Sequence, residues 1–224
     1  MRTKIYILVI FLLTACGGDY EYVRFQTAQP NDEKAQKSFN RKIKGEYLSC
    51  SNKNKKIVIE DKLILNYITF EFISHRNDLD FDSINTIDRT NNEALQKFFK
   101  EQNWNIEIEG DTVKGSVIAI DTLFQISDRQ VLKKFKGSYF LNTKDDENYW
   151  KVHRLDLTKD SLFIGHITPS DSLLRYDFVV KNEKLDVLDS SKTIEYVISP
   201  SRKEFKELMK PNSFEKTECY CKKK

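Results

Sequence analysis

The sequence predicts an α+β fold that is mostly antiparallel β, built from two similar β-rich units with one short helix each. Short stretches of alternating apolar and polar residues recur along the chain, which is typical of half-buried strands. Two stretches carry apolar residues at helical spacing instead, and no long helices alternate with the strands as a parallel sheet would require. Residues 43–130 and 131–224 repeat the same order of features, so we treat them as the two units.

The similarity of the two units rests on three pairs of matching segments. Their offset grows along the chain from 92 to 110 residues, as expected for a duplicated unit with loop insertions. The alternative is two β-rich stretches that share common patterns. The matches are IKGEYL at 43–48 with FKGSYF at 135–140; Ile57, Ile59, Leu63 and Leu65 with Leu155, Leu157, Leu162 and Ile164; and Leu95, Phe98, Phe99 and Trp104 with Phe205, Leu208, Met209 and Phe214.

The chain opens with a short apolar run, residues 5–13, which follows Arg2 and Lys4 and is followed by small residues. This order of basic, apolar and small residues is that of a secretory signal peptide. The run is too short to span a bilayer, which takes about 20 apolar residues. A buried first strand or helix would not place two cations before the run, so a signal peptide over residues 1–15 is expected.

The residues Leu13-Thr14-Ala15-Cys16 resemble the lipobox of bacterial lipoproteins. The resemblance implies cleavage before Cys16 and lipidation of Cys16, which anchors a protein to a membrane without spanning it. The signal and the β-rich body together resemble small, uncharacterised envelope lipoproteins of Gram-negative bacteria. That likeness implies a place in the bacterial cell envelope and no particular activity. We expect the outer membrane in preference to the inner one, although Gly17 at the second mature position does not decide between them.

Residues 16–42 are expected to form the lipidated N-terminus and a tether. They are mostly polar, although Tyr20 to Phe25 could form a short strand. A flexible chain of this length has an end-to-end distance of roughly 25–30 Å, which would hold the folded body close to the membrane.

Each unit then contains one short helix with its own start signal. Thr90 with Glu93, and Ser201 with Glu204, have the spacing of a capping box, and Pro211 ends the second helix. Most of the remaining chain reads as strand. The expected strands there are 113–119, 121–127, 150–157, 162–168, 175–181 and 193–199.

Four cysteines are present, and assigning Cys16 to the lipid leaves an odd number in an exported chain. Cys50 could form a disulfide with Cys219 or Cys221, and closing so long a loop would stabilise the fold by about 4 to 5 kcal/mol on a chain-entropy estimate. Two alternatives stay open: unpaired structural thiols, or Cys219-Tyr220-Cys221 as half of a thiolate metal site.

A histidine pair is the most specific lead toward chemistry. If residues 150–157 and 162–168 form a hairpin, His153 opposes His166, with Cβ atoms about 5 Å apart. Two imidazoles this close can share a metal ion or titrate as a coupled pair. The alternative is a partly exposed pair at the end of an apolar face, and a zinc site needs a third ligand that the sequence does not identify.

Three carboxylates at a spacing of two, Asp78, Asp80 and Asp82, begin like a calcium loop. Ser83 and Arg89, however, stand where that loop needs a glycine and a bidentate glutamate. The ordinary interpretation is the solvated face of a strand, and the alternative is a contact with a divalent ion or a cationic partner.

Catalytic motifs are absent from the sequence: it has no Gly-x-Ser-x-Gly elbow, no Gly-rich phosphate loop and no His-Glu-x-x-His. Lys and Arg number 37 against 34 Asp and Glu, so no strong basic field favours nucleic acid. We therefore expect a non-enzymatic binding or structural role with an unknown protein, peptide or glycan partner, and no cofactor. The alternative is a metal-dependent or hydrolytic enzyme that uses His153 and His166.

Overall fold

The computed structural model of the chain describes residues 20–80, 84–185, 192–210 and 213–223. The expected signal peptide and Cys16 lie outside the described residues. Thirteen strands and two α-helices are present in the described part, so the predicted α+β class with mostly β structure is confirmed. None of the described helices is both long and apolar enough to cross a membrane.

The strands connect into one mixed sheet whose order is β11-β12-β1-β9-β10-β13-β2-β3-β4-β6-β5, with β7 and β8 branching off at β9. The bounds are β1 Tyr20–Phe25, β2 Gly45–Ser49, β3 Lys55–Ile59, β4 Leu63–His75, β5 Asn105–Glu109, β6 Thr112–Gln125, β7 Gln130–Phe135, β8 Ser138–Lys144, β9 Trp150–Leu157, β10 Ser161–Ile167, β11 Val179–Leu185, β12 Lys192–Ile198 and β13 Phe214–Lys222; the helices are α1 Asn92–Glu101 and α2 Arg202–Leu208.

Two sets of four antiparallel strands share the same order. In the first, β2, β3 and β4 form a meander, and β6, which follows α1, pairs with β4. In the second, β8, β9 and β10 form a meander, and β13, which follows α2, pairs with β10. The two sets meet where β13 pairs with β2, at a junction that we call the seam. The seam therefore joins the start of the first set to the end of the second.

The segment expected to be a tether differs from the prediction from residue 20 onward. β1 pairs in parallel with β12 over six residue pairs. All other strand pairs among the described residues are antiparallel. Phe25 and Phe39 are each only 2% exposed. The fully buried Gln29 donates its backbone N–H to Asn142 Oδ1 at 2.6 Å. Alternating apolar residues in this polar segment are enough to add it to the folded body.

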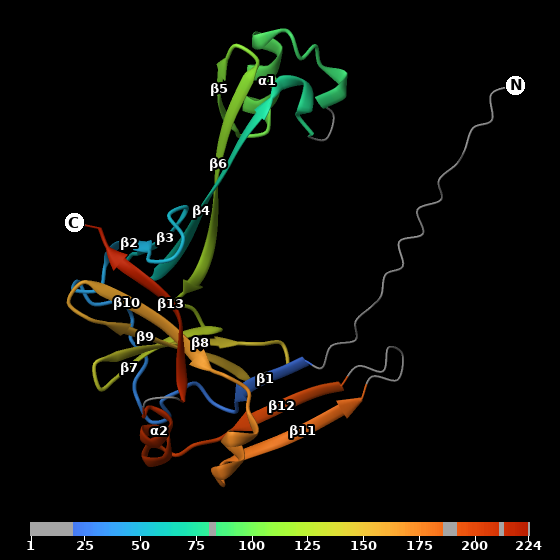
Figure 1. Cartoon of the computed structure of the whole chain (residues 1–224). Helices are drawn as coiled ribbons and strands as arrows, with labels where there is room; N and C mark the ends of the chain where they lie inside the picture. The colour runs from blue at the N-terminus through green and yellow to red at the C-terminus, as the bar shows by residue number, and fades with distance from the viewer. Residues whose placement is uncertain (1–19, 81–83, 186–191, 211–212, 224) are drawn as a thin grey trace, which may run out of the picture.

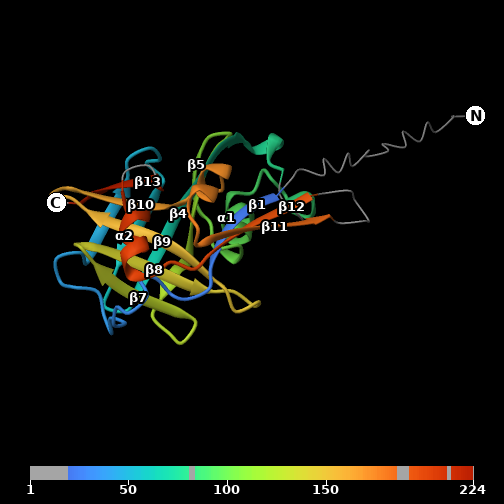
Figure 2. The same cartoon turned by 90° about the horizontal axis from the view of Figure 1, so that it is seen from below.

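Three apolar clusters hold the molecule together. The first lies among the strands around the seam, and Tyr47, Leu155 and Tyr220 are within it. The second lies under α2, which lies over the sheet strands in Figure 2. Its Phe205 ring meets the Phe140 ring of β8 with centroids 5.2 Å apart. The third is separate and packs α1 and β5 onto the far ends of β4 and β6.

The two helices begin differently. At α2, Ser201 and Glu204 form the predicted capping box. At α1, the N-cap is Asn91, whose side chain accepts hydrogen bonds from two backbone N–H groups, so the predicted box starting at Thr90 is wrong. The Thr90 hydroxyl instead donates to Asp88 at 2.7 Å, which takes it away from the helix end.

The long antiparallel pair of β4 and β6 rises out of the rest of the molecule (Figure 1). Its second strand runs without a break, whereas the sequence predicts two strands on either side of residue 120. We call residues 67–75 and 112–120 the arm, and we call α1, β5 and the turns at its far end the lobe. The remaining described residues form the body. Within the arm, the Phe72 ring lies where a Cβ on Gly115 would be, which explains a glycine in mid-strand.

Candidate functional site

The arm carries half of the large apolar side chains that the described residues expose, including the three most exposed isoleucines. Ile73 is 73% exposed, Ile120 60%, Ile118 56% and Phe70 51%. Soluble domains rarely expose contiguous apolar surface of this kind unless it meets a partner. The arm is therefore the first candidate for a functional site.

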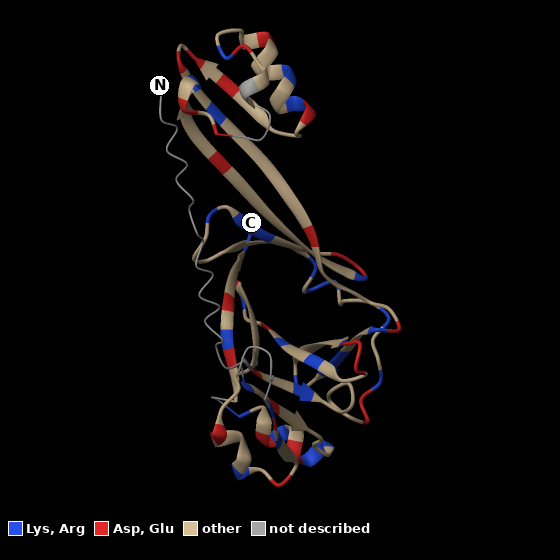
Figure 3. Cartoon of the chain, turned by 90° about the vertical axis from the view of Figure 1, so that its right-hand side faces the viewer, with Lys and Arg blue, Asp and Glu red and all other residues tan. Residues whose placement is uncertain are grey.

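Both faces of the arm carry exposed apolar residues, as the register shows, since directly opposed residues of an antiparallel pair share a face. Ile120 opposes Tyr67 and lies on one face with Ile118; Phe70 opposes Val117 on the other. Residues 63–70 and 115–120 contain no charged side chain. In Figure 3 the two long strands accordingly show extended stretches without acidic or basic residues. Within the arm, the face of Phe70 and Val117 carries no charged side chain, whereas the face of Ile118 and Ile120 carries only Glu71 and Lys114 toward its far end.

The edges of the arm are also open over most of its length. In the described sheet, β4 pairs with β3 only as far as Ile68, and β6 pairs with β5 only as far as Ser116. One further backbone bond, from Thr69 N–H to the carbonyl of Asn54, closes the base of the β4 edge. Beyond these points each strand pairs on one side alone, which leaves backbone donors and acceptors available to an added strand.

The histidine pair forms in the predicted hairpin. Leu157 opposes Leu162 and Leu155 opposes Ile164, as expected. The rings of His153 and His166 lie edge to face with centroids 6.0 Å apart. Burial, helped by the positive charge of His166, lowers the pKa of His153, so the neutral imidazole is favoured there.

Two small cavities touch the histidine rings from opposite sides. One, about 220 Å³, is bounded by β1 and includes Tyr22 and Lys151; the other, about 360 Å³, includes Leu123 and Glu218. Among the described residues, no third His, Cys, Asp or Glu joins the pair in a group with metal-ligand spacing. Zinc binding at His153 and His166 stays a prediction.

The three aspartates do not form one strand face. Asp78 ends a short 3₁₀ turn, Asp80 follows it, and both side chains are exposed, whereas Leu79 between them is buried in the lobe cluster. Asp82 lies outside the described residues. The turn arises because Arg76 is drawn inward, where its guanidinium donates to the carbonyls of Arg89 and Thr90.

A further cavity, about 750 Å³, opens beside α2 on the face of β10 away from His166, and the sequence did not point to it. Its wall holds more cationic than anionic side chains, which suits a negatively charged group. Arg154 at its base is already bonded to Asp156 at 3.0 Å and to the Met209 carbonyl, so it serves the fold first. The charged wall residues are Arg154, Arg175, Lys210, Lys216, Asp156 and Glu215.

The three remaining cysteines converge at the seam. Cys50 and Cys219 form a disulfide with their Cα atoms 5.4 Å apart, and the exposed Cys221 is free. The Cys221 sulfur lies 3.0 Å from the Cys50 sulfur. Within the described chain, these three form the one group of potential metal ligands whose atoms all lie within 4.8 Å of one another.

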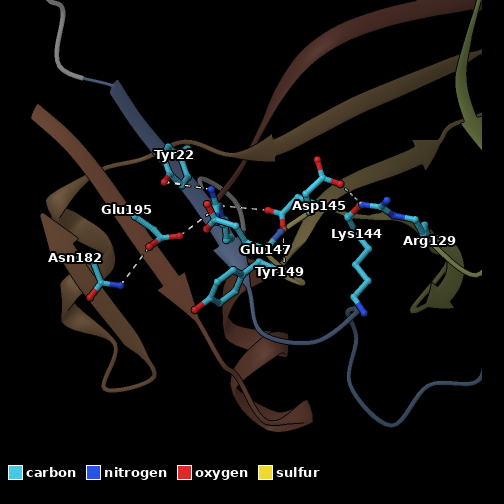
Figure 4. A network of polar contacts seen from close by, with 10 residues as sticks. Tyr22, Arg129, Lys144, Asp145, Glu147, Tyr149, Asn182 and Glu195 are labelled. Carbon is cyan, nitrogen blue, oxygen red and sulfur yellow. Dashed lines mark hydrogen bonds and ion pairs between the residues drawn. The ribbon is translucent and has the colours of Figure 1, made fainter. Parts of the chain in front are cut away.

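A polar network around Arg24 fastens β1 to β12 and to the β8–β9 turn; Figure 4 labels its members Tyr22, Asp145, Glu147 and Glu195. The Arg24 Nε lies 3.3 Å from both Asp145 and Glu195, and another guanidinium nitrogen pairs with Glu147. Burial opposes the charge, but these carboxylates outweigh it and raise the pKa of Arg24. Because every partner belongs to β1, β12 or the β8–β9 turn, we assign the network a structural role.

Comparison with known proteins adds no information about these sites. No family model matches the chain, and neither a curated protein nor a solved structure matches it.

Proposed function

We propose that the chain is a lipid-anchored protein of the bacterial envelope, on the outer membrane, whose role is binding rather than catalysis. In this proposal the arm binds an extended polypeptide segment of a partner protein. The observation that carries it is the exposed apolar surface on both faces of the arm, next to two open strand edges.

A polypeptide fits the arm better than a glycan does. An added strand would satisfy the open backbone groups of residues 117–123, and its alternating side chains would cover Ile118 and Ile120 on one face and Phe70 on the other. The exposed residues are mainly aliphatic and uncharged, whereas sugar hydroxyls need polar partners. The partner segment is therefore expected to be apolar and rich in β-branched residues.

The membrane attachment rests on the lipobox-like residues Leu13 to Cys16. Lipidation of Cys16 would place the folded body near the membrane, because β1 begins only four residues later. The mass of the mature N-terminal peptide tests this step alone: a lipid-bearing Cys16 supports it, and an unmodified Cys16 or a retained Met1 contradicts it.

The two β-rich units are in our proposal products of an ancient duplication. Both sets of four strands have the same order, and Gly45 and Gly137 take positive φ at matching positions. Tyr47 and Tyr139, two residues later, are both buried. In this view the arm is an elongation of the first unit's third and fourth strands, which the second unit lacks.

Site-specific photo-crosslinking in native envelopes tests the binding role. A crosslinker at Ile118 should capture one defined protein, and a crosslinker at Val180 serves as the matched control because Val180 is a similarly exposed apolar strand residue, 57% exposed, in the body. The identified protein, once purified, should bind the full chain and slow amide exchange at residues 117–123. The variant Ile118→Asp should weaken this binding at least about tenfold, a loss of about 1.4 kcal/mol, and Val180→Asp should not.

Several outcomes would contradict the proposal. Equal capture from Ile118 and Val180 would remove the arm as the site. If the crosslinker captured a second copy of the chain, and Ile118→Asp dissociated a dimer in solution, the arm would bind another copy of this chain instead of a different protein. Binding without added protection at the arm would exclude strand addition.

The second candidate function is a metal-dependent or hydrolytic enzyme at His153 and His166, favoured by the 6.0 Å separation of their rings. A zinc titration of the full chain and of the His153→Ala/His166→Ala variant tests it. Zinc binding that the double variant loses would support the enzyme; absent or unchanged binding would end it.

A further inference from the structure

The three cysteines at the seam carry an inference that is independent of the arm. Cys219 and Cys221 are two residues apart on β13, so their side chains lie on the same face of the strand. Cys50 follows the last residue of β2, and its backbone N–H donates to the Cys219 carbonyl at 2.9 Å. Cys50 thus faces both cysteines of β13, one directly and one diagonally.

Position in the chain makes both pairings reachable. Cys50 begins the turn between β2 and β3, where it is exposed, and Cys221 lies one residue from the end of β13, where it is exposed as well. The residues next to Cys50 and Cys219, which are Ser49 and Tyr220, form a pair in the ladder between β2 and β13. Cys50 itself lies just beyond the end of β2. A small adjustment of the turn is therefore enough to move the Cys50 sulfur from one partner to the other.

We propose that Cys50 exchanges its disulfide between Cys219 and Cys221, so that the seam is a thiol–disulfide exchange site with two alternative bonds. Cys221 attacks the Cys50 sulfur as the thiolate, the reactive form in such exchange. The Cys50–Cys221 bond forms and the Cys50–Cys219 bond breaks, with its electron pair leaving on Cys219. Cys219 takes a proton from solvent, to which Cys221 has given one. Nothing is oxidised or reduced overall, and no outside reagent is consumed.

The exchange would change which thiol is free at the seam. With Cys219 bonded, the free thiol is the exposed Cys221; with Cys221 bonded, the free thiol is the half-buried Cys219. In both forms a disulfide links the two sets of four strands, so the body stays closed. The chemistry available to an approaching protein thiol or disulfide, however, differs between the two forms.

The test is a rapid thiol trap on the full, non-reduced chain. An excess of N-ethylmaleimide labels whichever cysteine is free, an acid quench stops exchange, and fragmentation of the non-reduced peptides assigns the label. We expect labels on both Cys221 and Cys219, each with the complementary disulfide to Cys50. The ratio of labels should not depend on protein concentration, because the exchange is intramolecular.

Two variants complete the test. Cys221→Ser should keep the Cys50–Cys219 bond and show no label on Cys219, and Cys219→Ser should form the Cys50–Cys221 bond. A label on Cys221 alone in the unsubstituted chain would overturn the proposal. The proposal would also be overturned if Cys219 were labelled in Cys221→Ser as strongly as in the unsubstituted chain, or if Cys50 were labelled. A ratio of Cys219 label to Cys221 label that changes with protein concentration would overturn it as well.

Discussion

The body and the arm use the same kind of strand residue in opposite ways. In the body, apolar side chains such as Phe140 and Leu155 are fully buried between strands or under α2. In the arm, Ile118 and Ile120 point into solvent, whereas the base pairs with β3 and the far end is covered by the lobe. A two-stranded ribbon has little stability of its own, so the arm depends on its covered ends. The contrast separates residues that build the fold from residues that are available to a partner.

The first prediction compares one phenylalanine from each region. Phe140→Ala removes a fully buried ring that packs against Phe205 and Phe214, and should lower the free energy of unfolding by about 3 to 5 kcal/mol. Phe70→Ala removes a ring that is already half exposed, and should change that free energy by less than about 0.5 kcal/mol. Chemical denaturation of both variants measures the difference.

If Phe70→Ala were as costly as Phe140→Ala, the arm would be part of the core, and its exposure would have no bearing on binding. If the two variants differ as expected, Phe70 should matter only when the partner is present.

The second prediction compares the buried Asn142 with the half-buried Asn66. Asn142 accepts a hydrogen bond from Gln29 N–H and donates to three carbonyls. Asn142→Leu leaves those groups unpaired and should cost about 1 to 3 kcal/mol. Asn66, near the base of the arm, has a buried Oδ1 with no hydrogen-bond partner among the described residues, so Asn66→Leu should be neutral or slightly stabilising. Thermal unfolding of the two variants checks the opposite signs, and equal losses would contradict this account.

Local patterns predicted part of the local structure. The strand expected at 175–181 begins only at Val179, after a 3₁₀ turn that ends at Arg175, and Thr90 does not cap α1. Alternation placed the β9–β10 hairpin in its correct register, and Ser201 with Glu204 marked the start of α2. Both depend on residues close in the chain. The parallel pairing of β1 with β12 joins residues more than 170 apart, and no local signal specifies it.

The candidate sites were harder to predict for the same reason. Choosing Cys219 as the partner of Cys50 needs the register between β13 and β2, which is set by pairing across the whole fold. The arm was visible only as the uncharged runs at 63–70 and 115–120. Such runs indicate strands buried on both faces as readily as strands awaiting a partner, and the difference lies in what packs against them.

The third prediction compares the two helix caps. Ser201→Ala removes one half of the capping box of α2, which packs into the body, and should lower the global free energy of unfolding by about 1 kcal/mol. Asn91→Ala removes the cap of α1, which packs only into the lobe, and should speed amide exchange in α1 with little global effect. Native-state hydrogen exchange resolves the two, and a global loss from Asn91→Ala would mean that body and lobe unfold together.

The last prediction concerns a titration that belongs to the body. Burial and His166 lower the pKa of His153 from its ordinary 6.5. Between the two pKa values, His153 is therefore protonated in the unfolded chain and neutral in the folded chain. Stability should therefore fall as pH drops through about 6.5, and the fall should end below the lowered pKa of His153. Carboxylates whose pKa values are lowered act only at more acidic pH, so the interval from about pH 5 to about pH 7 isolates the histidine.

His153→Gln keeps a polar side chain of similar reach and removes this titration, so its free energy of unfolding should vary less with pH over the same interval. His166→Gln should flatten the curve in part, because it removes the second cause of the shift and leaves the burial of His153. Denaturant unfolding at several pH values measures both. An unchanged slope in His153→Gln would show that the proton uptake lies elsewhere. If lowering the pH reduced protection from hydrogen exchange only in the arm or the lobe, the pH-dependent loss of stability would lie outside the body.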